Sequence, residues 1–586
     1  MNWDLSVIYE CFQSDAFQED FKSLQPILDE IDAALNGSGS PLERLESSVK
    51  LLATLQEKAS RLGSFAYLTW SVDAMNEEAL AYIDQLMAKD VDAQRVLSDF
   101  SRYLNSMEDL DAIIAKSPLL LEHAFMLHEM QKNAAHRMDK AIESWMLRMS
   151  LTGGESFAQL REKLAATMTA SFRGEEIPLS AVRAKAYDPD PAVRKNAYEA
   201  ELAAYSKVDL AIAACLNGIK GEGRIQAEAR HFDSILSWTL HDSRMDKETL
   251  EALWTAVRET LPDFRRYLRA KGKLLGHEDG IPFYDLMAPV GKGLRTYTAE
   301  EARALLAEKM GSFSPALGAF IHEAFENRWI DMYPRTGKQG GAFCSSIHTL
   351  DISRILTNFA GSFSDISTIA HELGHAWHNR CMAGLPILLT DYPMPLAETA
   401  SIFNETLLSH AVLQTASPDE ALTIIEAELM EATQTIVDIY GRFLFESEVI
   451  DVRADHAMSV NELKDAMLRA QEESYGDGLA KDARHPYMWA CKGHYYSPTN
   501  HFYNFPYAFG LLFAKGVFAQ YLQKGESYVP VYNQLLRSCG NGTVRDVALS
   551  VGIDVRSVDF WRSSLNIVKE SIDRFMELCG SAEKIV

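Results

Sequence analysis

Two histidines and a glutamate lie in one short segment, residues 367–378, with a spacing typical of a metal site. His371 and His375 are four residues apart, so on a helix they share one face and can bind the same ion. Glu372 directly follows His371 and can reach a water at the ion without being a ligand. Nitrogen ligands with an open coordination position suit zinc. The pattern predicts one zinc ion per chain, with Glu372 as general base.

The alternative is a polar helix in which both histidines find protein partners. The flanking residues make this helix largely apolar; they are Ile369, Ala370, Leu373 and Ala376. A buried set of two histidines and a glutamate then needs a partner such as a metal. His378 lies three residues after His375, around the helix from the ligand face, and is predicted to have a supporting or structural part.

A catalytic zinc site needs a third protein ligand. A second predicted helix, over residues 395–405, carries Glu398 and Glu405 two turns apart on one face. Small and apolar residues surround Glu398, which suits a buried metal ligand. Glu405 is predicted to hydrogen-bond a ligand histidine. For both carboxylates, and for Glu405 in particular, a solvated position on the helix surface is the alternative.

A segment rich in histidine and tyrosine, residues 492–510, follows later in the chain. It holds two histidines and four tyrosines within 14 residues, which exceeds what packing requires. Hydroxyl and imidazole groups can donate hydrogen bonds to an oxyanion without competing for a metal. An aromatic stripe of the core is the alternative for any single tyrosine, and His494 with Tyr503 is the pair favoured for chemistry.

The elements that carry these residues are predicted to be helices almost throughout. Glycine and proline make up only about 9% of the chain, which disfavours strands and turns. Helical periodicity extends to about residue 35, a break follows at 37–41, and further helices run to about residue 151. Residues 329–363 are the one place where the pattern favours strands, and they predict a small sheet of two or three.

A second break at residues 188–191 stops helix continuation. Asp190 followed by Pro191 predicts a new helix start, and Thr298 with Glu301 has the spacing of a capping box. We place the main domain boundary near residue 187, between an N-terminal helical lobe over 1–187 and a catalytic part over 188–586. The fold is predicted to be mainly α.

Composition excludes several classes of function. The chain carries 57 basic and 82 acidic residues, a net charge of −25, and no basic face is evident, so nucleic acid is not an expected partner. The seven cysteines form no Cys-x-x-Cys pair. The first residues lack a signal-peptide pattern, and the most apolar stretch, 505–522, is interrupted by polar residues, glycines and a proline. We expect a cytoplasmic protein without a membrane partner.

Three segments together resemble the M3 family of zinc peptidases, and most of all its oligoendopeptidase F branch. They read HELGHAWH, AETASIFNE and HYYSPTNHFYNFPYAFG, in this order. The run YPRTGKQGGAFC at 333–344 is similar to the strand region ahead of the zinc helix in that branch. The resemblance covers about residue 190 to the end. It implies a two-lobed, zincin-type helical fold around a deep central channel, with the small sheet beside the HExxH helix.

The resemblance also implies site residues. The implied zinc ligands and general base are His371, His375, Glu398 and Glu372. The implied transition-state donors, in order of fit, are His494 with Tyr503, then Tyr507, with His501 as a rival to His494 and a candidate substrate contact. Backbone groups of Gly341, Ala342 and Phe343 are predicted to bind an extended peptide as an added strand.

The predicted function is hydrolysis of internal bonds in short unstructured peptides, because a narrow channel admits only an extended chain. Two alternatives stay open. A zinc dipeptidyl carboxypeptidase of related fold would need a cation for the free carboxylate, and Lys492 could supply it. A non-enzymatic helical peptide-binding scaffold is disfavoured by Glu372, because a structural metal site needs no base.

Overall fold

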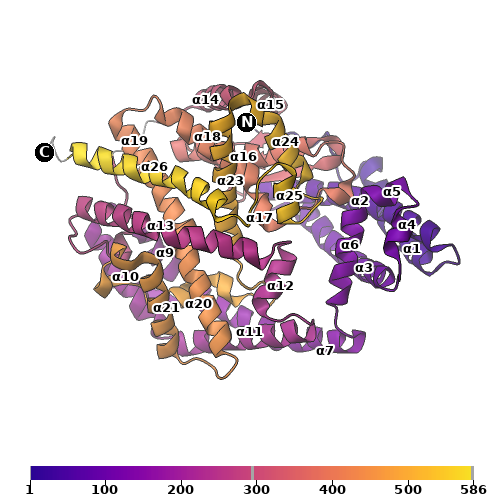
Figure 1. Ribbon diagram of the computed structural model, residues 1–586, viewed down its shortest axis with the longest axis horizontal. Helices are drawn as coiled ribbons and strands as arrows, with labels where there is room; N and C mark the ends of the chain where they lie inside the picture. Colours follow the sequence, from indigo (N-terminus) through magenta and orange to yellow (C-terminus); the bar gives the residue numbers. More distant parts are fainter. Residues whose placement is uncertain (1, 292–295, 583–586) are drawn as a thin grey trace. The chain divides into compact units, whose positions relative to one another are not determined.

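The computed structural model describes residues 2–291 and 296–582 (Figure 1). Helices dominate it, so the mainly α prediction is confirmed. The chain divides into two compact units whose segments alternate along the sequence. Unit 1 comprises Met1–Arg137, Arg295–Val412 and Gln520–Gly552, and unit 2 comprises Met138–Leu294, Leu413–Ala519 and Ile553–Val586. The boundary near residue 187 falls inside a segment of unit 2 and stays a prediction.

Unit 1 contains the N-terminal helices, a three-stranded sheet and the HExxH helix. Its helices are α1 (Asp15–Asn36), α2 (Pro41–Val72), α3 (Glu77–Asn105), α4 (Leu110–Ile114), α5 (Pro118–Glu122), α6 (Ala124–Ala135), α14 (Ala299–Phe313), α15 (Pro315–Glu326), α16 (Phe363–Cys381), α17 (Met394–Ala397), most of α18 (Thr399–Leu413), α24 (Val529–Ser538) and α25 (Val544–Ser550). Its strands are β3 (Ile330–Asp331), β4 (Phe343–Ile347) and β5 (Ile352–Leu356), and its 3₁₀ turns are η3 (His348–Leu350), η4 (Ile387–Leu389) and η9 (Gly525–Tyr528).

The described part of unit 2 contains one β-hairpin, and its other regular elements are helical. Its helices are α7 (Lys140–Ser150), α8 (Gly154–Thr167), α9 (Leu179–Ala184), α10 (Pro191–Tyr205), α11 (Asp209–Ala229), α12 (Ile235–Asp242), α13 (Lys247–Leu274), α19 (Pro418–Ala432), α20 (Ile439–Val452), α21 (Val460–Tyr475), α22 (Met488–Cys491), most of α23 (Phe505–Lys524) and α26 (Val558–Ala582). The π-helical segment η5 (Thr433–Asp438) leads into α20, and the 3₁₀ turns are η1 (Lys185–Tyr187), η2 (Phe283–Asp285), η6 (Gly476–Gly478), η7 (Lys481–Ala483) and η8 (Gly493–Tyr496).

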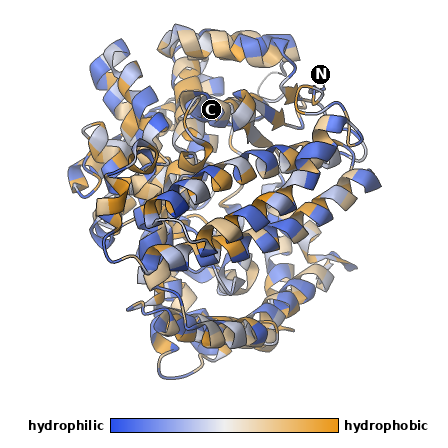
Figure 2. Ribbon diagram, turned by 90° about the vertical axis from the view of Figure 1, so that its right-hand side faces the viewer, coloured by the Kyte–Doolittle hydropathy of each residue, from blue (hydrophilic) through white to orange (hydrophobic). Residues whose placement is uncertain are grey.

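The helix-start signals of the sequence are confirmed. Asp190 caps α10, where its carboxylate accepts from the backbone N–H of Ala192 and Pro191 is the first helical residue. Thr298 and Glu301 form the capping box of α14. Polar and apolar residues alternate along most helices in Figure 2, as expected for helices that bury one face.

The sheet of unit 1 has the strand order β3-β5-β4. β3 and β5 are parallel, whereas β4 and β5 are antiparallel, with Phe343 opposite Leu356. The predicted sheet within 329–363 is therefore confirmed. Both β4 and β5 pack against α16, so the sheet supports the helix that carries the HExxH segment.

The expectation that strands occur only there is wrong. β1 (Thr169–Phe172) and β2 (Glu175–Pro178) form an antiparallel hairpin in unit 2. Its two-residue turn is Arg173-Gly174, and both residues have positive φ, 53° and 87°. A turn of that kind favours glycine and connects twisted strands well. The strands are four residues long and largely polar, so they carry no clear apolar alternation.

Within the described residues, no single helix has the length and apolar composition of a membrane span. Helices α10 and α11, which are bent by 69° relative to each other, are long and apolar enough for a span only when they are taken together.

Candidate metal centre

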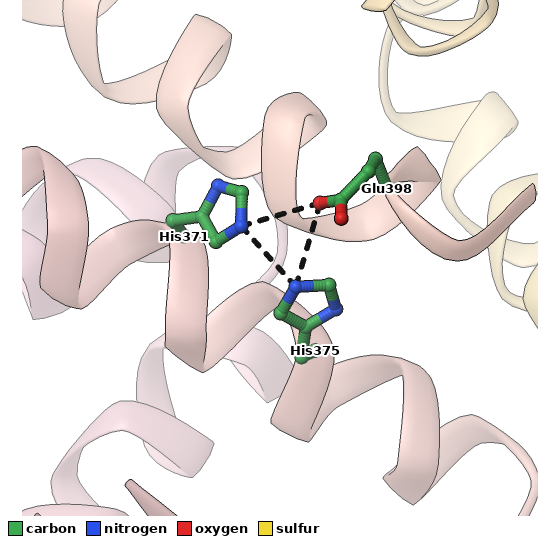
Figure 3. Close-up of side chains that lie close together, drawn as sticks. All are labelled: His371, His375 and Glu398. Atoms are coloured by element: carbon green, nitrogen blue, oxygen red, sulfur yellow. Dashed lines mark hydrogen bonds and ion pairs between the residues drawn. The ribbon is translucent and has the colours of Figure 1, made fainter. Parts of the chain in front are cut away.

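Three predicted ligands converge in unit 1 (Figure 3). The Nε2 atoms of His371 and His375 lie 3.2 Å apart, and Glu398 Oε2 lies 3.2 Å from the first and 3.5 Å from the second. All three ligand atoms fall within 4.8 Å of one another, so the group can hold a metal ion. Two imidazole nitrogens and one carboxylate oxygen form a donor set that zinc accepts, and a catalytic zinc ion takes water or substrate as its fourth ligand.

A fourth residue, Glu405, orients the first ligand. Its Oε1 lies 2.5 Å from Nδ1 of His371, and the Oγ of Ser367 donates to its other oxygen at 3.3 Å. When the Nδ1–H of His371 donates to this carboxylate, Nε2 keeps its lone pair toward the ligand group. The contact predicted between Glu405 and a ligand histidine is thus present.

The electrostatics of the group favour a positive charge at its centre. For Glu398, burial is outweighed by the hydrogen bond with His371 and by the two imidazoles, which together lower its pKa to about 2. For His371, burial is outweighed by Glu398 and Glu405, which raise its pKa well above the usual value. Burial, and then the neighbouring His371, lower the pKa of His375 to about 4, so this ring is neutral near pH 7.

Glu372 lies on the same helix but outside the ligand group. Its side chain is buried, with 6% of the residue exposed, and it makes no hydrogen bond or ion pair with any described residue. Burial raises its pKa to about 7. A carboxylate with that pKa can both accept and release a proton near neutral pH, which is what a general base needs.

Helices α16 and α18 approach closely enough to bring the ligands together because residue 374 is glycine. A Cβ at Gly374 would lie 2.5 Å from the carbonyl oxygen of Ala400 and from Cα of Ser401. Sequence reasoning missed this residue, although a glycine inside a strongly helical pattern is a signal of close packing.

Glu398 itself lies at the junction of two helices, which corrects the expectation of one continuous helix. It ends α17 and precedes α18, while its carbonyl still accepts from the N–H of Ile402. Ser401, which sequence reasoning also missed, donates its hydroxyl to Glu398 Oε2 at 2.7 Å and thereby fixes the carboxylate.

A sequence profile of peptidase family M3 matches residues 184–567. The chain belongs to peptidase family M3. The group B oligopeptidase PepB of Streptococcus agalactiae is 23% identical over 97% of this chain and 96% of its own length. The oligopeptidase PepF of Bacillus subtilis is 25% identical over 66% of this chain and 58% of its own length. The family match, together with an oligoendopeptidase F homologue of Lactococcus lactis that is 24% identical over 66% of this chain and 64% of its own length, places this M3 chain in the oligoendopeptidase F branch and identifies it as a metalloendopeptidase.

Solved structures show the same fold. A putative peptidase from Chlamydophila abortus superposes with a TM-score of 0.85 at 22% identity, covering 98% of both chains. The oligoendopeptidase F of Enterococcus faecium superposes with a TM-score of 0.70 at 16% identity, covering 96% of this chain and 98% of its own. The fold of this M3 peptidase therefore extends over both units.

His378 serves packing in this M3 peptidase. Its ring is fully buried, its Nε2 lies 3.1 Å from the carbonyl oxygen of Leu536, and it stacks on Tyr392 with ring centroids 4.4 Å apart. Burial lowers its pKa to about 3, so the ring is neutral. Two roles were predicted for His378, support of the metal ligands or a structural role, and these contacts fit the structural role.

His494, Tyr503 and Tyr507 form a group of their own in unit 2. The rings of His494 and Tyr503 stack with centroids 5.3 Å apart and planes 10° apart. The hydroxyl of Tyr507 donates to the hydroxyl of Tyr503 at 3.3 Å. His494 is exposed and both tyrosines are partly exposed, so all three residues are accessible to solvent.

His501 differs from this group because it is buried, with 2% of the residue exposed. Its Nδ1 lies 3.2 Å from the ammonium of Lys220, and its ring faces Gly223, where a Cβ would lie 2.3 Å from Nε2. These contacts hold the ring inside unit 2, and the predicted substrate contact of His501 stays a prediction.

The segment predicted to bind an extended peptide lies at a sheet edge. β4 begins at Phe343 and pairs with β5 on one side only, among the described strands. Gly341 and Ala342 precede it, and Gly341 accepts from the side-chain amide of Asn358 at 2.9 Å. The buried ammonium of Lys338 pairs with Asp331 and holds this loop to the sheet. Peptide binding along β4 stays a prediction.

Replacing Glu405 by alanine should weaken metal affinity about 10–100-fold, because His371 loses the carboxylate that orients its ring. Glu405→Gln should lose less, since its carbonyl oxygen still accepts from Nδ1–H. Titration against a metal-buffering chelator measures both affinities. Equal affinity in Glu405→Ala and the parent protein would show that this contact does not support the ligand.

Proposed function

We propose that this chain is a zinc-dependent oligopeptidase that hydrolyses internal bonds of short unstructured peptides. The observation that carries the proposal is the convergence of His371, His375 and Glu398, with the unpaired carboxylate of Glu372 next to it on the same helix. A purely structural metal site does not need such a base. The cytoplasmic location and the peptide partners favoured by the sequence are part of the same proposal.

When bound by these three side chains, zinc supplies Lewis acidity, which makes a nearby water easier to deprotonate and a carbonyl easier to attack. Glu372 takes the proton of the attacking water and passes it to the nitrogen of the leaving amine. Burial raises the pKa of Glu372 above its usual value, which favours proton uptake from the attacking water. Glu405 keeps His371 in the tautomer with a free Nε2 lone pair.

Tyr503 and His494 are proposed to donate hydrogen bonds to the oxyanion of the tetrahedral intermediate. Support comes from the resemblance to the family and from the stacked rings, which fix the direction of the Tyr503 side chain. Tyr507 donates to the Tyr503 hydroxyl and so leaves the Tyr503 proton free to point elsewhere. Backbone groups of the edge strand β4 are proposed to align the extended substrate.

The substrate class is proposed from the relatives. The Streptococcus agalactiae and Bacillus subtilis relatives are named as oligopeptidases, and peptides of that kind are the substrates expected here. An unstructured peptide can adopt the extended conformation that pairing with β4 requires, whereas a folded domain cannot.

The test is a set of internally quenched peptides with free or blocked ends, followed by mass spectrometry of the fragments. Internal cleavage of peptides with an acetylated N-terminus and an amidated C-terminus is expected. Release of C-terminal dipeptides from free acids alone would favour the dipeptidyl carboxypeptidase reading instead. Binding without any cleavage would favour the non-enzymatic scaffold.

Removing the Tyr503 hydroxyl should lower kcat by about 10²–10³ with little change in KM, because the lost hydrogen bond forms mainly in the transition state. Tyr507→Phe is the matched variant and should lose less, since it acts on the oxyanion only through Tyr503. Steady-state kinetics on one blocked peptide compares them. A large loss in Tyr507→Phe with none in Tyr503→Phe would exchange the two roles.

A further inference from the structure

The residue just before Tyr503 has an unusual backbone conformation. Phe502 has φ of 51°, in the left-handed region that bulky residues rarely adopt. Its side chain is buried and packs on Phe443 of α20, with ring centroids 5.3 Å apart. A strained backbone persists only where the surrounding contacts hold it, and such positions often serve function.

The contact that holds Phe502 is a buried carboxylate. The backbone N–H of Phe502 donates to Glu446 Oε1 at 3.0 Å, and Glu446 is 2% exposed. The ammonium of Lys220 on α11 is fully buried and lies 2.6 Å from the same oxygen. Lys220 therefore neutralises the charge of Glu446, and the carboxylate remains free to accept from the backbone.

The residue just after Tyr503 is held by the same helix. Arg442 lies one turn before Glu446 on α20, so both side chains point from one face. Its Nη1 donates to the side-chain oxygen of Asn504 at 2.8 Å. Asp438, the last residue of the π-helical segment η5, pairs with Arg442 and completes the set.

His501 adds a third point of attachment. Its carbonyl oxygen accepts from the hydroxyl of Thr239 on α12 at 3.1 Å, and its Nδ1 accepts from Lys220. Residues 501, 502 and 504 are thus each bonded to a helix of unit 2. Among the described residues, Tyr503 makes no hydrogen bond or ring contact with α20. Its ring contacts those of His494 and Tyr507.

We propose that Glu446 and Arg442 are positioning residues that fix the Tyr503 side chain for catalysis, with Lys220 neutralising Glu446. The inference rests on the proposed role of Tyr503 as an oxyanion donor. A hydrogen-bond donor accelerates the reaction only when it is already aimed at the developing charge, so a loose turn at Phe502 would lower kcat without changing substrate affinity.

The test compares two double variants that both lack the buried ion pair. Lys220→Met with Glu446→Gln keeps an acceptor for the N–H of Phe502, whereas Lys220→Met with Glu446→Leu removes it. Neither leaves an unpaired buried charge. We expect kcat of the leucine pair to be about tenfold or more below that of the glutamine pair, with equal KM.

Adding Tyr503→Phe to the leucine pair shows whether the loss acts through Tyr503. We expect a further fall in kcat about tenfold or more smaller than the fall of about 10²–10³ for Tyr503→Phe in the parent protein, because the leucine pair has already lost that part of the Tyr503 contribution. Fully multiplicative losses, or equal kcat in the leucine and glutamine pairs, would overturn the proposal.

Hydrogen exchange of residues 498–507 tests the same contact without any turnover. Exchange at Phe502 should be about tenfold or more faster in the leucine pair than in the glutamine pair. Glu448→Leu, on the same helix but paired with Arg469 away from this turn, is the control and should exchange as the parent does.

Unchanged exchange in the leucine pair, or faster exchange in the control, would overturn the proposal. Absence of peptide cleavage in the parent protein would instead overturn the proposed function.

Discussion

Replacement of Glu372 by glutamine is expected to lower kcat by about 10²–10⁴ while leaving metal content unchanged. The carboxylate is buried, belongs to none of the contacts that join the three ligands, and makes no hydrogen bond with a described residue. Glutamine has the same shape but cannot accept the proton of the attacking water. Since the base acts in the chemical step, KM should change little.

The measurement pairs steady-state kinetics with elemental analysis of the purified variant. Glu300→Gln, an exposed position in the first turn of α14, is the matched control and should behave as the parent protein. Loss of metal from Glu372→Gln would mean that Glu372 is a ligand and that the assignment of the base is wrong. Turnover near that of the parent would mean that another group takes the proton.

The local part of the metal site was predictable from the sequence because it depends on helix periodicity. A spacing of four residues places His371 and His375 on one face, and Glu405 lies within reach of His371 once its helix packs alongside. The capping residues Asp190 and Thr298 were also predictable from local sequence, because a helix start needs acceptors for its first N–H groups.

Other features depend on contacts between distant segments, which a single sequence does not display. The buried ring of His501, for example, contacts Lys220, which lies 281 positions earlier in the chain. The hairpin at 169–178 was not predicted, because its short strands show little alternation of apolar and polar residues. The Arg173-Gly174 turn was its main local signal. The alternation of two compact units along the chain is likewise a property of the tertiary contacts rather than of any local break.

Removal of the metal is expected to abolish peptidase activity, and addition of zinc is expected to restore it. The ligand group is suited to binding a cation, because His375 is neutral near pH 7 and Glu398 is ionised, and both lie close to His371. Without the Lewis acid, water is a poor nucleophile at neutral pH and Glu372 alone cannot compensate. Activity measured after exhaustive chelation, and again after titration with zinc, tests this directly.

His375→Ala should give the same loss of activity by a different route, because two remaining ligands cannot hold a catalytic zinc ion. Zinc should then fail to restore turnover, and elemental analysis should find the variant depleted of metal. His322→Ala, an exposed histidine on α15 of the same unit, is the control and should keep both metal and activity.

Full activity in chelated protein would contradict the metallopeptidase mechanism itself, whereas a metal-bound but inactive His375→Ala would show that the ion is held elsewhere. The two experiments therefore test different claims. Chelation removes the ion and tests the chemistry, whereas His375→Ala removes one proposed ligand and tests the assignment of the ligands.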